Sequence, residues 1–214
     1  MRDRIKDQTG YVLDLLYILL LFTLLVFFLK MVWYMTYTPV YYDTAASVGL
    51  AGFNIIARLI FSVLILVTRI FLVFYFVRWS YLAYSYLSKR DELYYLTHAP
   101  STAVWSWFVP VLNLFMPFLI VREIYEAMHD IVKDGEMRIS SWLLPLWWGL
   151  FLASVFSGFF LASSSVASLI TDPANMTGGW LSYIVIMSIK IGSLITSVVL
   201  FRRLKKLAQL LSVM

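Results

Sequence analysis

The chain has 214 residues, of which 62% are apolar and 14% charged, and it carries a net charge of +5. This balance lies outside the range of ordinary soluble domains, and the lack of cysteine excludes disulfides, thiol catalysis and cysteine-ligated clusters. The basic residues gather at the ends of apolar blocks rather than on one polar surface. That pattern indicates orientation in a membrane and argues against nucleic-acid binding.

Five apolar blocks approach or exceed the roughly 20 residues that a helix needs to cross a hydrocarbon core. The first block follows the basic residues Arg2, Arg4 and Lys6, as the core of a secretory signal would. It is too long for such a signal and no small-residue cleavage site follows it, so we interpret it as an uncleaved first span. The blocks cover residues 11–33, 50–77, 104–121, 142–170 and 180–201.

The second block carries polar side chains inside an apolar helix. Arg69 lies near the middle of the expected span, nine residues before Arg78. Asn54 and Arg58 fall on nearly the same helical face as Arg69, because the eleven-residue step from Arg58 makes about three turns. The aromatic-rich stretch that follows, within residues 78–102, is typical of an interfacial helix at the lipid headgroups.

The third block is interrupted twice by proline. Pro110 and Pro117 stand on either side of Asn113, and each removes a backbone hydrogen bond and clashes with the preceding helical turn. Broken backbone is tolerated at membrane depth where protein or a watery cavity surrounds it. We therefore predict that residues 104–121 form a re-entrant segment that enters and leaves on one side. A kinked fifth helix that crosses the membrane is the alternative.

The positions of lysine and arginine favour the re-entrant interpretation. Five crossings would put the two basic chain ends on opposite sides, whereas the positive-inside rule puts both in the cytoplasm. Four crossings and a re-entrant segment place thirteen of the seventeen basic residues on the cytoplasmic side and none in the two outer loops. The sequence thus predicts an all-α integral membrane protein with four transmembrane helices and with cytoplasmic N and C termini.

The second half of the chain contains a polar cytoplasmic segment and two adjoining spans. Residues 122–141 predict an amphipathic helix whose apolar face includes Ile124 and Met128. Both spans that follow have small residues at every fourth position, and such rows let helix backbones approach closely. We therefore expect the two spans to pack as an antiparallel pair. The rows are Gly149, Ala153 and Ser157 in the first of these spans and Ser188, Gly192 and Thr196 in the second.

A motif in and after the third block resembles a known family. Residues 107–114 read WFVPVLNL, and Pro117-Phe118 and Arg122-Glu123 follow. This order resembles the signature of the bacterial membrane family called domain of unknown function 4328, and the likeness extends over about residues 61–211. Because that family has no established activity, the resemblance implies a membrane architecture and no chemistry. The motif residues are Trp107, Pro110, Asn113, Pro117, Arg122 and Glu123.

The resemblance also suggests how the chain is organised and where it resides. Residues 1–49 hold the first span and first outer loop, and this part looks like an addition to the family. Residues 50–211 form the multi-span membrane domain, with spans at about 50–77, 142–170 and 180–201 and the re-entrant segment at 104–121. We expect the protein to reside in the bacterial cytoplasmic (inner) membrane.

Charged side chains inside spans are the strongest indication of a functional site, because they are unfavourable in lipid and usually line an interior or a cavity. Arg69 and Lys190 lie well inside their spans, and Asp14 is the only acidic residue within a span. This excess of positive charge would attract an anion, a lipid phosphate or a partner's carboxylate. The alternative is that the long basic side chains are paired or reach the headgroups.

Three polar residues of the motif have structural interpretations. Asn113 either lines a gate with its amide or, as we favour, satisfies backbone groups that the two prolines leave without a partner. Arg122 and Glu123 follow immediately, and we expect them to anchor the exit of the re-entrant segment at the cytoplasmic interface.

Catalysis has no positive indication in this sequence. Glu126 and His129 have the spacing of a carboxylate-bridged metal site, but such sites need further glutamates and a second pair of this kind. No nucleophile elbow, phosphate-binding loop or zinc-protease motif occurs. We therefore expect no enzyme activity, no metal and no cofactor.

Two functions are left to weigh. We favour association with membrane lipids, with other membrane proteins or with a second copy of the chain, through the small-residue rows and the aromatic cytoplasmic rim. The alternative is a small channel or transporter with an anion-attracting path. That path would be lined by Arg69, Lys190 and the segment between Pro110 and Pro117, with Asn54 and Arg58 along it.

Overall fold

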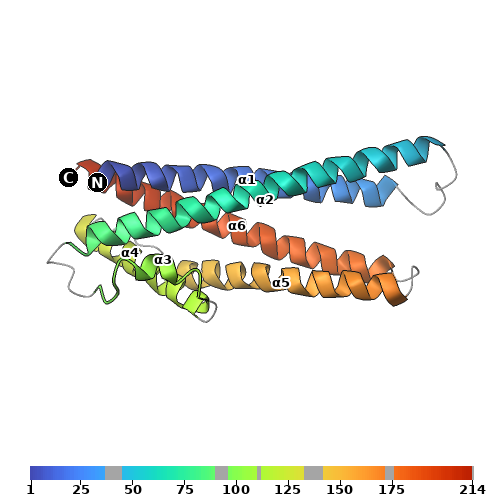
Figure 1. Ribbon diagram of the computed structural model, residues 1–214. Helices are drawn as coiled ribbons and strands as arrows, with labels where there is room; N and C mark the ends of the chain where they lie inside the picture. The colour runs from blue at the N-terminus through green and yellow to red at the C-terminus, as the bar shows by residue number, and fades with distance from the viewer. Residues whose placement is uncertain (37–44, 90–95, 110–111, 133–141, 172–175, 214) are drawn as a thin grey trace.

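The protein is all-helical, as predicted, in the part of the chain that the structure describes. This computed structural model describes residues 1–36, 45–89, 96–109, 112–132, 142–171 and 176–213 (Figure 1). The elements are α1 (Arg2–Thr36), α2 (Ala45–Leu87), α3 (Thr102–Trp105), the 3-10 helix η2 (Leu112–Leu114), α4 (Met116–Val132), α5 (Leu143–Thr171) and α6 (Met176–Val213).

Three helical segments among the described residues are long and apolar enough to cross a membrane. They are Arg2–Val32, Leu59–Leu87 and Tyr183–Val213, and Leu143–Ser157 is a shorter apolar helix. This composition is that of a multi-pass membrane protein. Helix α2 has 43 residues, which at 1.5 Å per residue make about 64 Å, roughly twice the thickness of a hydrocarbon core. The long helices therefore extend well beyond the bilayer.

The long helices form an elongated bundle in which α2 crosses α1, and α6 lies between α1 and α5 (Figure 1). Helix α1 packs on α2 and α6, and α6 packs on α5. The N and C termini lie together at one end of the molecule, and α3 and α4 occupy the half nearest that end. There α4 packs on α2, α5 and α6. The short elements thus bridge α2 to the α5–α6 pair in the half that holds the termini.

The best-packed core lies in the same half of the molecule. Side chains from α1, α2, α4 and α6 meet there with almost no exposed surface, and they include Ile5, Trp79, Ile124, Phe201 and Leu204. The middle of α2 has the opposite character, since its large apolar side chains point outward, among them Leu59, Leu66 and Ile70. Outward apolar side chains are what a lipid-facing helix needs.

Part of the aromatic stretch after the second block belongs to this core, whereas Tyr81 of the same stretch is 43% exposed. The prediction of an interfacial position stays a prediction. Helix α2 continues to Leu87, and Trp79 and Tyr84 have no exposed surface. The Trp79 indole donates a hydrogen bond to Oγ1 of Thr9 on α1, at 2.9 Å. Trp79 also packs against Phe201 on α6, with 5.1 Å between ring centroids, and the Tyr84 hydroxyl donates to Glu123 on α4.

The third block does not form one continuous helix. It contains α3, then η2, and α4 begins only at Met116, with Pro117 in its first turn, where a missing N–H is harmless. Both α3 and α4 lie in the terminal half of the bundle, and α4 runs back toward the end that holds the termini (Figure 1). The described residues before and after the break therefore lie in the same half of the bundle. Pro110 lies outside the described residues.

The break in this block is stabilised differently from the way we expected. The Trp148 indole on α5 donates a hydrogen bond to the Leu114 carbonyl oxygen, at 2.9 Å. The Asn113 side-chain oxygen, which we expected to be used in the break, is buried without a hydrogen-bond partner in the described structure. Only the backbone N–H of Asn113 takes part, by donating to the Val109 carbonyl at 2.8 Å.

Helices α5 and α6 pack side by side, as predicted, but the small-residue rows contribute unevenly. A Cβ atom added to Gly192 would lie 3.8 Å from Leu150, so this glycine is at the contact. A Cβ at Gly149 would meet nothing within 4 Å, and Ser188 is exposed. The pair is also held by a hydrogen bond from the Trp147 indole to Oγ of Ser197, at 3.0 Å.

Candidate functional site

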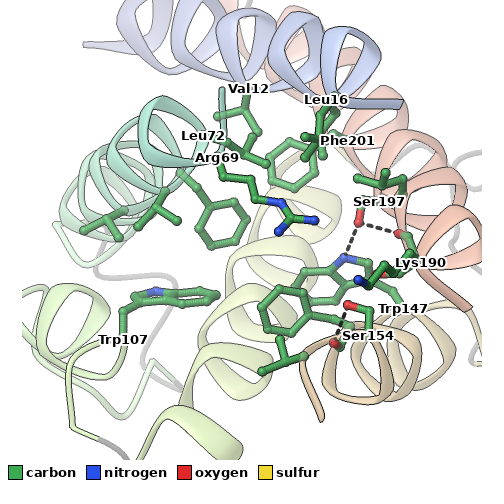
Figure 2. A pocket seen from close by; sticks show the side chains of 18 of the residues that line it. Val12, Leu16, Arg69, Leu72, Trp107, Trp147, Ser154, Lys190, Ser197 and Phe201 are labelled. Carbon is green, nitrogen blue, oxygen red and sulfur yellow. Dashed lines mark hydrogen bonds between the residues drawn. The ribbon is translucent and has the colours of Figure 1, made fainter. Parts of the chain in front are cut away.

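A cavity of about 550 Å³ lies between α1, α2, the broken third block, α5 and α6 (Figure 2). Its volume is typical of sites that bind small molecules. Most of its wall is apolar, and its polar side chains come from five elements or segments of the chain. These polar lining residues are Thr23, Arg69, Asn113, Ser154, Lys190, Ser193 and Ser197.

Two positive charges face this cavity. Arg69 comes from α2 and Lys190 from α6, and their charged groups point into the same space (Figure 2). Sequence reasoning selected both residues, and the structure places them in the wall of one cavity although they come from helices far apart in the chain.

Neither cation has an acidic partner in the described part of the chain. The ion pairs found there are His98–Glu123, Arg122–Glu126 and His129–Asp130. Asp14, the acidic residue expected within the first span, is exposed and does not line the cavity. A third cation within a span, Lys30, lies over the Tyr183 ring at 3.7 Å from its centroid. Arg69 and Lys190 therefore differ from Lys30, because the described residues give them neither an acidic partner nor an aromatic ring.

The two other candidates on α2 are only partly described. Asn54 and Arg58 lie within the helix, as predicted, but their side chains are outside the described residues. Their expected place beside Arg69 stays a prediction.

The hydroxyl groups of the cavity make hydrogen bonds within their own helices. Ser197 donates to the Ser193 carbonyl at 2.7 Å, and Ser154 donates to the Phe151 carbonyl at 2.8 Å (Figure 2). Thr23 donates to the Leu19 carbonyl at 2.7 Å. No carboxylate or histidine is among the described lining residues. The arrangement suits binding.

An aromatic cluster closes the cavity toward the chain termini. Phe76 lies 4.8 Å from Trp107 and 5.5 Å from Phe201, measured between ring centroids, and Trp79 lies 5.1 Å from Phe201. Trp107 of the family motif is thus part of the floor, and its indole nitrogen has no hydrogen-bond partner in the described structure. The sequence showed many aromatic residues here, but rings from three segments meet only in the fold.

The cavity opens sideways, between α2 and α5. Three of its lining residues are also on the outer surface: Val73 is 53% exposed, Phe108 62% and Val155 47%. They come from α2, from the broken block and from α5. If the bundle crosses a membrane, the exposed side chains beside this opening would face lipid chains.

Glu123 of the motif connects three segments of the chain. Its carboxylate accepts hydrogen bonds from the Tyr84 hydroxyl at 2.6 Å and from the Thr97 hydroxyl at 3.0 Å, and it contacts Nδ1 of His98 at 3.0 Å. The His98 backbone N–H in turn donates to the Tyr84 oxygen at 3.0 Å. These bonds fasten the segment before α3 to α2 and α4.

The neighbouring motif residue has a weaker role. Arg122 pairs with Glu126, one turn further along α4, at 2.8 Å, and both side chains are about half exposed. The hydrogen bond and charge of Glu126 raise the pKa of Arg122. Glu126, which with His129 has metal-site spacing, is thus engaged by an arginine. Pro117 is buried at the start of α4.

Comparison with protein families gives one match. The family model described as "Domain of unknown function (DUF4328)" matches residues 42–206. The match contains the motif that suggested this family and begins earlier than expected. It leaves out α1, although Val12 and Leu16 of that helix line the cavity. Comparison with curated proteins and with solved structures gave no significant match.

Proposed function

The chain belongs to the DUF4328 family, and on that basis we propose that it is a multi-pass protein of the bacterial cytoplasmic membrane that binds an anion within the bilayer. The observation that carries the proposal is the pair Arg69 and Lys190, which face one cavity without an acidic partner in the described chain. The proposal concerns binding and assigns no catalytic activity.

The energetic basis is the instability of unpaired charge in a membrane. A charged residue at the centre of a membrane helix costs about 2.5–3.5 kcal/mol on insertion scales. Two like charges that face one cavity also repel each other. An anion between the two side chains would reverse both effects, because it supplies the counter-charge and accepts charge-assisted hydrogen bonds. Intramembrane charges of this kind generally mark a ligand or ion site.

The proposed topology has four crossings, a re-entrant segment at residues 104–121, and both termini in the cytoplasm. Two observations support it. The N and C termini lie at one end of the molecule (Figure 1), and basic residues are concentrated in the segments that reach this end. In this topology the aromatic floor faces the cytoplasm, and the cavity lies at the depth of the lipid chains.

Binding is favoured over an open channel by the aromatic floor. Phe76, Trp107 and Phe201 pack against one another on the terminal side of the cavity, and these rings would obstruct the passage of an anion toward the cytoplasm. The association function also stays a prediction, because lipid alone would cover the outward apolar side chains of α2. Copurification of partners from native membranes remains its test.

The experiment measures anion binding by the full-length protein in a non-ionic detergent. Inorganic phosphate, sulfate and an alkyl phosphate are titrated while tryptophan fluorescence is followed, since Trp107 and Trp147 line the cavity. Wild-type protein is expected to bind at least one of them. Arg69→Gln and Lys190→Gln should each weaken that binding by about 10- to 100-fold, as expected for loss of one hydrogen bond to a charged group.

The matched control is Arg78→Gln, which removes an exposed arginine nine residues further along the same helix. It should bind as the wild type does. If no anion binds, or if all three variants bind equally well, the proposal is wrong.

A further inference from the structure

We infer that the anion is the headgroup of a membrane amphiphile, a lipid monophosphate or fatty carboxylate that enters the cavity sideways from the bilayer. The inference rests on the proposed function and names its ligand. The compact anionic group would lie between Arg69 and Lys190, and the hydrocarbon chain would leave through the opening at Val73, Phe108 and Val155.

The first support is the size and chemistry of the cavity. Its volume of about 550 Å³ is far larger than one phosphate or carboxylate group, and apolar side chains make up most of its wall. Val12, Leu16, Leu72 and Phe76 are among them. An inorganic anion would leave this apolar surface in contact with water, whereas a hydrocarbon chain would cover it. Each methylene group removed from water contributes favourably to binding.

The second support is the direction of the opening. The aromatic floor closes the cytoplasmic side, and the exposed lining residues lie on the outer surface of the bundle between α2 and α5. In the proposed topology that surface is in contact with lipid chains. A ligand already dissolved in the bilayer would reach the two cations directly. A hydrated anion would have to cross lipid or the floor.

The third support is depth, which limits the size of the headgroup. Arg69 lies nine residues from Arg78, or about 13 Å along the helix at 1.5 Å per residue. A headgroup bound there sits below the membrane surface, so its polar part must be desolvated when it binds. Desolvation is least unfavourable for a single compact anionic group that two cations can neutralise. Three of the hydroxyl groups in the cavity wall, those of Thr23, Ser154 and Ser197, already donate to carbonyls of their own helices.

The experiment compares inorganic phosphate with dodecyl phosphate, and laurate serves as the carboxylate counterpart. Full-length protein in a non-ionic detergent is titrated with each, and tryptophan fluorescence reports binding. Val73→Trp places a large side chain at the opening. Val63→Trp is the matched control, because Val63 is an equally exposed valine on α2 that does not line the cavity. Val155→Trp blocks the opening from α5 if the first variant is unstable.

Dodecyl phosphate is expected to bind the wild type at least tenfold more tightly than inorganic phosphate. Val73→Trp and Val155→Trp should weaken dodecyl phosphate binding at least tenfold, whereas Val63→Trp should leave it unchanged. If inorganic phosphate binds as tightly as dodecyl phosphate, depends on Arg69 and is unaffected by Val73→Trp, the ligand is a free anion. That result overturns this inference and leaves the proposed function intact. Loss of Arg69 with no effect on any of the three ligands overturns both.

Discussion

Replacing Arg69 with methionine should make the ligand-free protein more stable while it removes anion binding. Methionine keeps an unbranched side chain of similar length, so the cavity wall is largely preserved. On the insertion scale, an arginine at the centre of a membrane helix costs about 2.5–3.5 kcal/mol. Because Arg69 has access to the cavity opening, its replacement recovers only part of this free energy. We therefore expect a gain of about 1–2 kcal/mol in the free energy of unfolding, because like-charge repulsion with Lys190 also disappears.

The assay is thermal unfolding of delipidated protein in a non-ionic detergent, for the wild type, Arg69→Met and Arg78→Met. Arg69 and Arg78 are both exposed on the same helix, but Arg78 does not line the cavity, so its replacement should change stability by less than about 0.5 kcal/mol. For a chain of this length, 1 kcal/mol corresponds to a shift of roughly 2–4 °C in Tm. A destabilised Arg69→Met protein would refute the reasoning, since it would mean that Arg69 has a structural partner. An unchanged Tm for Arg69→Met would also refute it, since it would mean that the Arg69 charge is solvated at the surface of the bundle.

Three further predictions concern the fold and its orientation. Glu123→Ala should destabilise the protein by about 3 kcal/mol, because Tyr84 and the segment before α3 lose a shared acceptor, whereas Glu126→Ala removes only an exposed pair and should change stability by less than about 0.5 kcal/mol in the same unfolding assay. Trp148→Phe leaves the Leu114 carbonyl without its donor and should lower stability by about 1–2 kcal/mol. The same loss of stability on replacing an exposed tryptophan by phenylalanine would contradict this prediction. A tag after the last residue should be protected from an impermeant label in right-side-out vesicles, and labelling there would rule out a cytoplasmic C terminus.

The candidate site shows how far reasoning from residues extends. Arg69 and Lys190 could be selected from the sequence because a charge within an apolar block is unfavourable wherever the helix packs. The sequence could not show that they share one cavity, because the two residues are 121 positions apart. No local pattern indicates which helix faces meet. The same holds for Glu123, whose motif position was visible but whose partners Tyr84 and Thr97 come from distant segments.

The sequence by itself determined that the chain is helical, apolar and repeatedly long enough to cross a membrane, because block length and composition are local properties. It also located the break near Pro110 and Pro117, since proline disrupts a helix in any surroundings. Only the tertiary structure decided that Trp79 and Tyr84 are buried and that Trp148, not the Asn113 side chain, stabilises the break. Those outcomes depend on contacts between helices far apart in the chain, and burial is a property of the packed assembly rather than of any one segment.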